Sequence, residues 1–132
     1  MLEDQFEDLK KRIRERKWGG EVTMTAMPNG GMLIRVPAVP VKGWNRTEAD
    51  VLFVAPPGYP SAQPDCFWVE PNNFRLENGS TAQASNDGNP IPGDPQPRST
   101  TWFSWHLQKW NPNQDSLIGY FHTILDRLMP AR

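Results

Sequence analysis

The chain has 132 residues, a length that fits one domain with a substantial core and is short for two. Its 14 Lys and Arg residues nearly balance 15 Asp and Glu residues, and the formal net charge is −1. No overall field therefore attracts nucleic acid or an anionic membrane. We expect a single domain over residues 1–132 whose partner is a protein or a small molecule.

The cysteine content and the N-terminus indicate a compartment. A single cysteine cannot form an internal disulfide, which fits a reducing environment. No apolar run is long enough to span a bilayer, and the first residues lack the basic start and apolar core of a signal peptide. The sequence also lacks Cys and His clusters with metal-ligand spacing and a Gly-rich phosphate loop. We expect a cytoplasmic protein without a metal or cofactor.

Four apolar residues near the start recur at helical spacing and predict an amphipathic helix over residues 2–17. They are Leu2, Phe6, Leu9 and Ile13. Gly19 and Gly20 are expected to end this helix. Acidic side chains come first and basic ones follow, an order that the helix dipole favours.

Alternating apolar residues predict two strands, over residues 22–26 and 32–36, joined by a tight turn at residues 28–31. Pro37 and Pro40 are expected to end the second strand, because proline cannot donate a hydrogen bond to a sheet. We expect an edge or a loop after residue 36.

Two further apolar runs, at residues 51–54 and 66–69, are rich in residues that favour strands. The proline-rich segment 56–64 joins them as a turn. Together with the first two strands, they predict a four-stranded antiparallel meander.

Residues 70–101 carry Asn, Gly, Pro, Asp and Ser with almost no apolar periodicity, which indicates a long loop that is either functional or mobile. After it, apolar residues on one face predict a C-terminal helix that ends at Leu128, before Pro130. We expect Asn113 or Asp115 as its N-cap. The apolar residues are Leu117, Ile118, Phe121, Ile124, Leu125 and Leu128.

Two segments resemble the ubiquitin-conjugating (E2) family: the proline-rich turn 56–64 and the sequence Trp110-Asn111-Pro112. In that family a strand ends in a Tyr-Pro-rich turn, and a Trp-x-Pro turn after the active-site cysteine leads into a helix. The resemblance implies an α+β, UBC-like fold with an N-terminal helix, a four-stranded antiparallel meander, a long irregular loop and a C-terminal helix. It is strongest to bacterial E2-like proteins that accompany ubiquitin-like proteins and E1-like activating enzymes.

In that family the thioester cysteine lies about two helical turns before the tryptophan of the Trp-x-Pro turn. The matching tryptophan here is Trp110, and counting back eight residues from it reaches Trp102. No residue from 67 to 132 is a cysteine. The resemblance therefore implies an E2-like protein without the standard thioester step. The family's His-Pro-Asn motif is also missing. The most similar segment is residues 86–90, where Asn86 or Asn89 could donate the hydrogen bond that the motif's asparagine gives to the oxyanion.

Two residues are candidates for chemistry at a displaced site. Cys66 is the only thiol, and its apolar neighbours are typical of a small buried residue, while Asp65 beside it would raise its pKa. His106 lies close to the position that an E2 uses for chemistry, where it could act as a general base. The alternative for His106 is a packed, hydrogen-bonded side chain.

The E2 family uses its first helix to bind E1 and two turns to bind E3 ligases, which implies partner contacts at the matching positions. The matching residues are Lys10, Lys11, Arg14, Tyr59, Pro60 and Trp110. Each has a structural alternative, because the cations solvate a helix end and the aromatic rings can be structural wedges.

Three functional hypotheses follow from these residues. The first is a cysteine-less E2-like protein that binds a ubiquitin-like protein or an E1-like enzyme without covalent transfer, and is thus not an enzyme of the standard kind. The second is a conjugating enzyme that uses Cys66 or His106. The third is a protein-interaction module that reuses the fold, with the loop 70–101 ordering on its partner.

Overall fold

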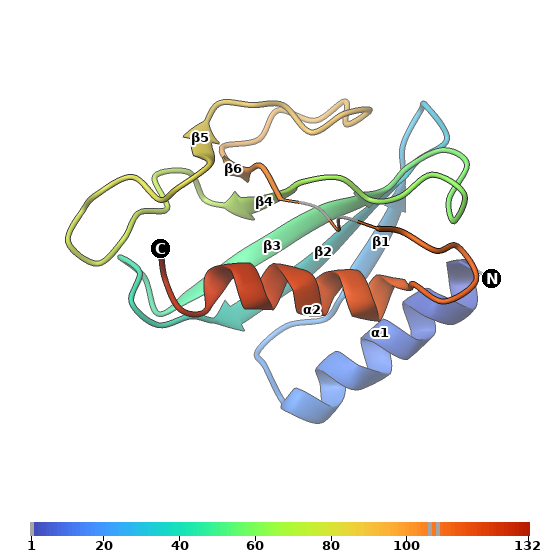
Figure 1. Ribbon diagram of the computed structural model, residues 1–132, viewed down its shortest axis with the longest axis horizontal. Helices are drawn as coiled ribbons and strands as arrows, with labels where there is room; N and C mark the ends of the chain where they lie inside the picture. The colour runs from blue at the N-terminus through green and yellow to red at the C-terminus, as the bar shows by residue number, and fades with distance from the viewer. Residues whose placement is uncertain (1, 106, 108) are drawn as a thin grey trace.

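The computed structural model describes residues 2–105, 107 and 109–132. Within this part of the chain, two helices cover one face of a six-stranded antiparallel sheet with the strand order β1-β2-β3-β4-β6-β5 (Figure 1). The elements are α1 (Leu2–Arg16), β1 (Thr23–Ala26), β2 (Met32–Pro40), β3 (Glu48–Ala55), β4 (Phe67–Glu70), β5 (Ser85–Asp87), β6 (Thr101–Phe103) and α2 (Leu117–Leu128). The α+β class and the UBC-like layout are confirmed. No helix in the described residues is long and apolar enough to cross a membrane.

The first helix has the predicted apolar face but ends one residue earlier than expected. Leu9 and Ile13 are buried, and the helix ends at Arg16. Lys17, and not a glycine, takes the left-handed conformation at the helix end, with φ 56°. Gly20 has a different role, because a Cβ atom there would lie 2.4 Å from Cγ of Pro37. It allows the chain after α1 to pass close to β2.

The N-cap of α2 is Ser116, whose hydroxyl accepts a hydrogen bond from the backbone N–H of Gly119 at 3.2 Å. The prediction of Asn113 or Asp115 as the cap was wrong. The Asp115 carboxylate instead accepts the backbone N–H of Asn111 at 2.6 Å, and the N–H of Asn113 donates to the Asn111 side chain at 2.9 Å. Both residues stabilise the turn that precedes the helix.

The predicted hairpin is confirmed, but its second strand is longer than expected. β2 continues through Pro37 to Pro40 and lies between β1 and β3. The expected strand end after residue 36 was wrong because a β-bulge between Val36 and Val39 removes Pro37 from the regular hydrogen-bond ladder. Within the bulge, the N–H of Ala38 donates to the Asp50 carboxylate at 2.9 Å.

The four predicted strands are adjacent in the sheet as a meander, and the sheet then continues beyond them. β6 pairs with β4, and β5 pairs with β6 at the edge. Both added strands have only three residues, and β5 lies within the segment expected to be a loop.

Aromatic rings fill the core between the helices and the sheet. Phe53 of β3 packs against Tyr120 and Phe121 of α2, with ring centroids 5.6 and 6.5 Å apart. Trp44 stacks on Phe74 at 4.3 Å and donates its indole N–H to the carbonyl of Leu128 at 2.9 Å. This indole joins the β2–β3 connection to the end of α2 and to the segment after β4.

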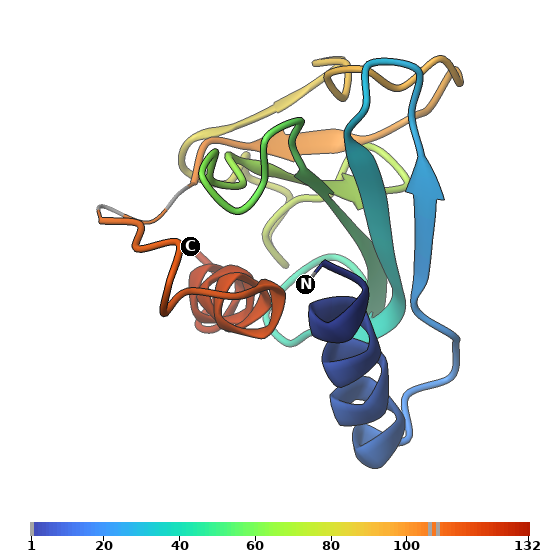
Figure 2. The same cartoon turned by 90° about the vertical axis from the view of Figure 1, so that its right-hand side faces the viewer.

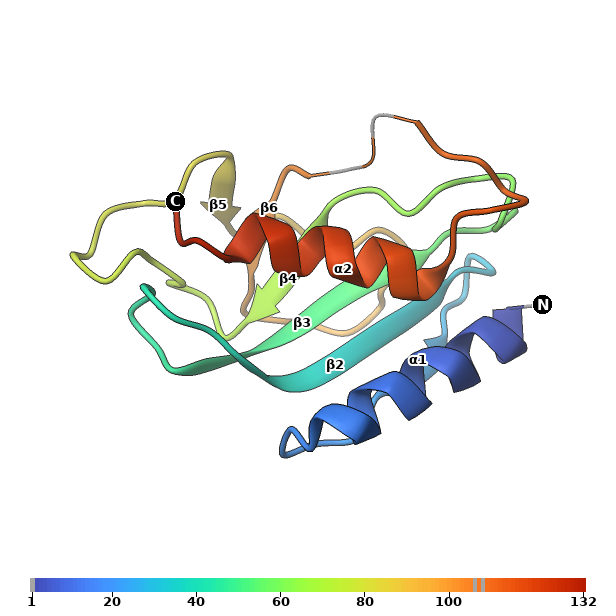
Figure 3. The same cartoon turned by 60° about the horizontal axis from the view of Figure 1, so that its bottom comes forward.

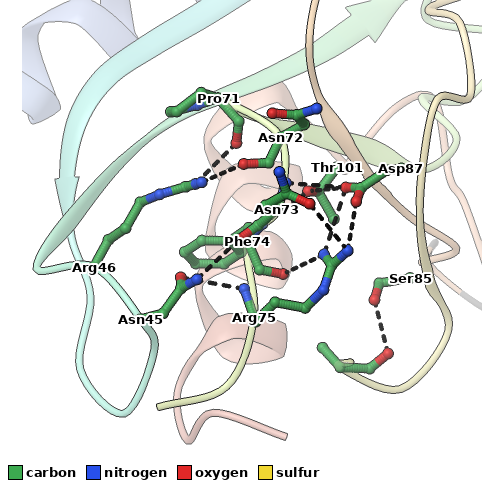
Figure 4. A network of polar contacts seen from close by, with 11 residues as sticks. Asn45, Arg46, Pro71, Asn72, Asn73, Phe74, Arg75, Ser85, Asp87 and Thr101 are labelled. Atoms are coloured by element: carbon green, nitrogen blue, oxygen red, sulfur yellow. Dashed lines mark hydrogen bonds and ion pairs between the residues drawn. The ribbon is translucent and has the colours of Figure 1, made fainter. Parts of the chain in front are cut away.

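The first part of the long segment after β4 is held by a polar network (Figure 4). Arg75 forms an ion pair with Asp87 at 2.5 Å, and Asp87 also accepts hydrogen bonds from the Thr101 hydroxyl at 2.7 Å and the Asn73 N–H at 3.1 Å. Arg46 donates to backbone carbonyls of the same segment. These contacts place the buried Phe74 in the core on the helix side.

The second part, residues 88–100, crosses the opposite face of the sheet (Figure 2). Ile91 packs there in a small buried cluster with Leu33, Leu52, Val54, Trp68 and Met27. The Trp68 indole donates to the carbonyl of Asn89 at 3.0 Å. Residues of this segment line a cavity of about 260 Å³. The sheet is thus covered on both faces, by helices on one and by irregular chain on the other.

Candidate functional site

The position expected for the thioester cysteine lies inside the sheet. Trp102 is the middle residue of β6, and it pairs with Trp68 of β4 on one side and with Asn86 of β5 on the other. Its side chain is half-buried and packs on the smaller core cluster, on the face opposite the helices. A bulky ring in a paired strand therefore lies at the position that the resemblance assigns to the family's thioester cysteine.

The only thiol lies next to this tryptophan. Cys66 immediately precedes β4, and its half-buried side chain packs, like that of Trp102, against the smaller cluster. Both side chains therefore lie against the same cluster, on the face of the sheet opposite the helices. The structure thus brings together two residues, Cys66 and Trp102, that are 36 positions apart in the sequence.

The surroundings of Cys66 favour the neutral thiol. Burial raises the pKa of the thiol, and the charge of Asp65, whose carboxylate oxygen lies 3.6 Å from Sγ, raises it further. Hydrogen bonds from the backbone near Trp105 and from the Trp102 side chain act in the opposite direction but do not reverse the shift. Because the thiolate is the nucleophilic form, this environment lowers the reactivity of the group.

The backbone on both sides of Cys66 is fixed. Its N–H donates to the carbonyl of Trp105 at 2.8 Å, and its carbonyl accepts the hydroxyl of Tyr120 at 2.9 Å. Cys66 has a φ of 64°, in the left-handed region that a non-glycine residue adopts only where its surroundings require it. The Tyr120 hydroxyl, which also lies 3.1 Å from the Trp105 carbonyl, links α2 to both segments.

The two asparagines that offered the nearest match to the missing His-Pro-Asn motif lie in and just after the edge strand β5. Asn86 is exposed in β5, directly opposite Trp102 in the register. Asn89 follows β5, and its backbone carbonyl accepts the Trp68 indole. Of the two asparagines, Asn86 is therefore the one that lies next to Trp102, on the neighbouring strand. His106 lies outside the described residues.

Three of the residues expected to bind partners meet in one cluster. The Tyr59 and Trp110 ring centroids are 5.8 Å apart, and the Trp110 indole donates to the carbonyl of Pro60 at 2.6 Å. The Tyr59 hydroxyl donates to the side chain of Gln5, which also accepts the backbone N–H of Leu117 at 3.1 Å. The cluster therefore joins the proline-rich turn to the first turns of both helices.

This cluster is half-buried, and its polar atoms are used internally. Burial raises the pKa of Tyr59 to about 12, with a smaller contribution from Asp115. A phenol in this setting stays protonated at neutral pH and serves as a hydrogen-bond donor. The cluster can present ring edges and Pro60 to a partner, but the phenol has no acid-base role there.

The basic residues of α1 lie apart from this cluster, further along the helix. Lys10 is partly buried over the Phe6 ring at 5.4 Å and approaches Glu7 at 3.8 Å. Arg14 pairs with Glu21 at 3.2 Å in solvent. Lys11 is exposed at the groove between α1 and α2 that Ile118 also lines. Of the three, Lys11 is the cation most available for an intermolecular contact.

The site offers packing and hydrogen bonding more than acid-base chemistry. Among residues 2–105, 107 and 109–132, no group of three His, Cys, Asp or Glu side chains is arranged to hold a metal ion. The chain's single thiol, that of Cys66, packs beside Trp102 on the smaller cluster, and its pKa is raised.

Two polar residues that were not predicted from the sequence have central positions in the structure. Gln5 links Tyr59 to α2, and Arg127 is 2% exposed between α2 and the sheet. A signal existed for both, because Gln5 lies three residues after Leu2 and Arg127 lies three residues after Ile124. A polar residue on a predicted apolar helix face is thus a candidate for a buried hydrogen-bonding role.

The sequence was also compared with known families, proteins and structures. The family described as prokaryotic E2 family E matches residues 7–131. No curated protein and no solved structure matches the chain.

Proposed function

Because the chain belongs to prokaryotic E2 family E, we propose that it binds a ubiquitin-like protein or an E1-like activating enzyme non-covalently, without standard thioester transfer. Membership of an E2-like family implies in general terms an interaction with such proteins. The finer proposal, a binding protein in place of a thioester carrier, rests on the site itself.

The observation that carries the proposal is the identity and placement of Trp102. It occupies the position that the E2 resemblance assigns to the nucleophile, and pairing on both sides holds it in β6. An indole cannot form a thioester. The neighbouring thiol of Cys66 is half-buried with a raised pKa, which disfavours the reactive form.

Two surfaces are proposed as partner contacts. The exposed cation Lys11, with Lys10 and Arg14 on the same helix, would meet an acidic surface of an E1-like enzyme. The Tyr59, Pro60 and Trp110 cluster would offer an apolar contact of fixed shape, because its hydrogen bonds and ring packing hold it rigid.

The proposal is tested by mixing the purified protein with ATP, a ubiquitin-like protein and an E1-like enzyme, both proteins being encoded in the same genome. Non-reducing gels would detect an adduct, and a binding titration would be run in parallel. We expect saturable binding and no reducible adduct. A reducible adduct, or no binding to either protein, would overturn the proposal.

The contact through α1 has its own test with a matched control. Lys11→Glu should weaken binding to the E1-like enzyme by a few-fold and reduce the salt dependence of the affinity, since one attractive charge becomes repulsive. Lys42→Glu makes the same change at an exposed lysine between β2 and β3 and should leave the affinity unaltered. Equal affinities for both variants would remove α1 from the proposed interface.

A second candidate function is supported by the contact between Cys66 and Trp102. In this alternative the Cys66 thiolate attacks the carbonyl carbon of an E1-bound thioester, the new thioester forms on Sγ and the E1 thiol leaves. Cys66→Ala should then abolish a reducible adduct, whereas Cys66→Ser should give an adduct that resists thiol reductants. If the wild-type protein forms no adduct, this alternative fails.

A further inference from the structure

Arg127 is a buried cation in the last turn of α2. Arg127 is 2% exposed, and one of its Nη atoms donates a hydrogen bond to the backbone carbonyl of Gln83 at 2.6 Å. The guanidinium lies over the rings of Phe103 and Trp105, at 5.0 and 5.9 Å from their centroids. Figure 3 shows this end of α2 beside the β5 and β6 end of the sheet.

A second cation lies beside it. The guanidinium of Arg132 is 5.8 Å from the centroid of the same Trp105 ring. Burial and, to a smaller extent, the charge of Arg132 together lower the pKa of Arg127 to about 10. Two like charges therefore lie against one tryptophan ring, although each would be more stable with an anion nearby.

The donors at this place exceed the acceptors. In the described part of the chain, Nη1 of Arg127 and the indole nitrogen of Trp105 are buried without a hydrogen-bond partner. Buried donors normally have a partner, and a buried charge normally has a counter-charge. No ion pair to either arginine occurs among residues 2–105, 107 and 109–132, and the three residues outside this range, Met1, His106 and Gln108, carry no carboxylate.

We propose that Arg127, Arg132 and the Trp105 indole form a binding site for an oxyanion, the chemistry that a carboxylate and a phosphate share. An oxygen of the anion would accept the free N–H groups of Arg127 and Trp105, and its charge would offset the repulsion between the arginines. Trp105 and Arg132 are half-buried and form the outer side of the site. The inference does not depend on the proposed E2-like function.

The test is a titration followed through the indole N–H signals in ¹H–¹⁵N NMR spectra, with the Trp105 signal assigned from Trp105→Phe. Acetate, inorganic phosphate and chloride would be added at constant ionic strength. We expect a saturable shift of the Trp105 signal with acetate or phosphate and a much smaller one with chloride. Equal, non-saturating shifts of all six indole signals would overturn the site.

Two arginine variants make the test specific. Arg132→Gln, at the last residue of the sequence, should weaken binding of the anion by at least about fivefold. The other indole signals should stay in place. Arg16→Gln is the matched control, because Arg16 also lies over a tryptophan, Trp18, at 5.2 Å, but is exposed. An equal effect of both substitutions would show a general charge effect and overturn the site.

A further experiment with peptides distinguishes the two sources of the anion, a peptide carboxylate and a phosphate group. A short acidic peptide with a free C-terminal carboxylate and the same peptide as its C-terminal amide would be compared with phosphate. Preference for the free acid assigns the site to a protein terminus, and preference for phosphate assigns it to a phosphorylated ligand. Failure of both to bind more tightly than chloride would contradict the proposal.

Discussion

On one face of the sheet, α1 and α2 enclose a continuous core of rings and aliphatic side chains, whereas residues 88–100 cross the other face (Figure 2). The helix-side core contains most of the buried apolar residues, and the opposite cluster has six. Beside that smaller cluster, a chain of ion pairs joins Asp50, Arg35, Glu70, Arg98 and Asp94.

The comparison teaches that the two coverings depend on different interactions. Helix packing buries large apolar areas, which is a strong and salt-independent contribution. The irregular covering depends on one buried isoleucine, on the hydrogen bond from the Trp68 indole to Asn89, and on partly exposed ion pairs, which are weak and screened by salt. Solution conditions should therefore affect the second face far more than the first.

The largest expected effect is on the helix side. Phe53→Ala should lower the free energy of unfolding by about 4 kcal/mol, because the ring is fully buried against Tyr120 and Phe121 and its loss leaves a cavity. Urea unfolding followed by circular dichroism measures this. Thr25→Ala, at an exposed strand position, is the control with a change below about 0.5 kcal/mol.

The matching change on the other face should cost less. Ile91→Ala is expected to lower the free energy of unfolding by about 2 kcal/mol, at the lower end for such truncations because irregular chain can collapse into the space. Amide exchange should speed up in residues 88–100 while the helices keep their protection. If the loss equalled that of Phe53→Ala, the two coverings would not differ as argued.

The segment before residue 88 gives a pH-dependent prediction. The hydrogen bond with Arg75, followed by those with Thr101 and Asn73, lowers the pKa of Asp87 to about 2, against burial. Its contribution is therefore complete above the ordinary value of 3.8 and is lost as the pH falls towards 2.

Asp87→Asn tests this directly. The variant should be about 2 kcal/mol less stable than the wild-type protein at neutral pH, because the charged hydrogen bonds of the network are lost. The difference should shrink between pH 4 and pH 2. Glu77→Gln, at an exposed position, is the control. A difference that stayed constant across this window would contradict the assigned role of Asp87.

The smallest expected effect concerns the ion pairs. Arg35→Gln should cost less than about 1 kcal/mol, since the Arg35 side chain is 40% exposed and the attraction is screened. Unfolding measured at low salt and at about 1 M sodium chloride should show the difference disappear at high salt. A loss that persisted at high salt would indicate that packing of the Arg35 stem matters more than its charge.

Much of the fold was predictable because, in long segments, the spacing of the apolar residues indicates which face of the element is buried. Leu9 and Ile13 in α1, and Phe121 and Ile124 in α2, occupy the helix faces that their spacing predicts. The short strands β5 and β6 were not predictable, because three residues cannot show a period and their pairing depends on distant chain.

The candidate site was predictable only in part. The resemblance identified Trp102 as the residue at the nucleophile position, and the sequence identified Cys66 as the only thiol. The proximity of these two residues, however, depends on the pairing of β4 with β6. The donors of Trp105 and Arg127 became recognisable only once α2 was packed against the sheet. Expectations for His106 remain predictions.

The bulge in β2 gives this strand one more residue than its neighbour. From Val36 to Val39 the chain takes three steps, while the paired residues Val51 and Ala49 on β3 are two steps apart. Both valines can therefore face the core although their spacing breaks the alternation of a regular strand. Removal of Ala38 would restore that alternation without turning any core residue outward, so β2 has a position where the chain can shorten by one residue and keep its inward face.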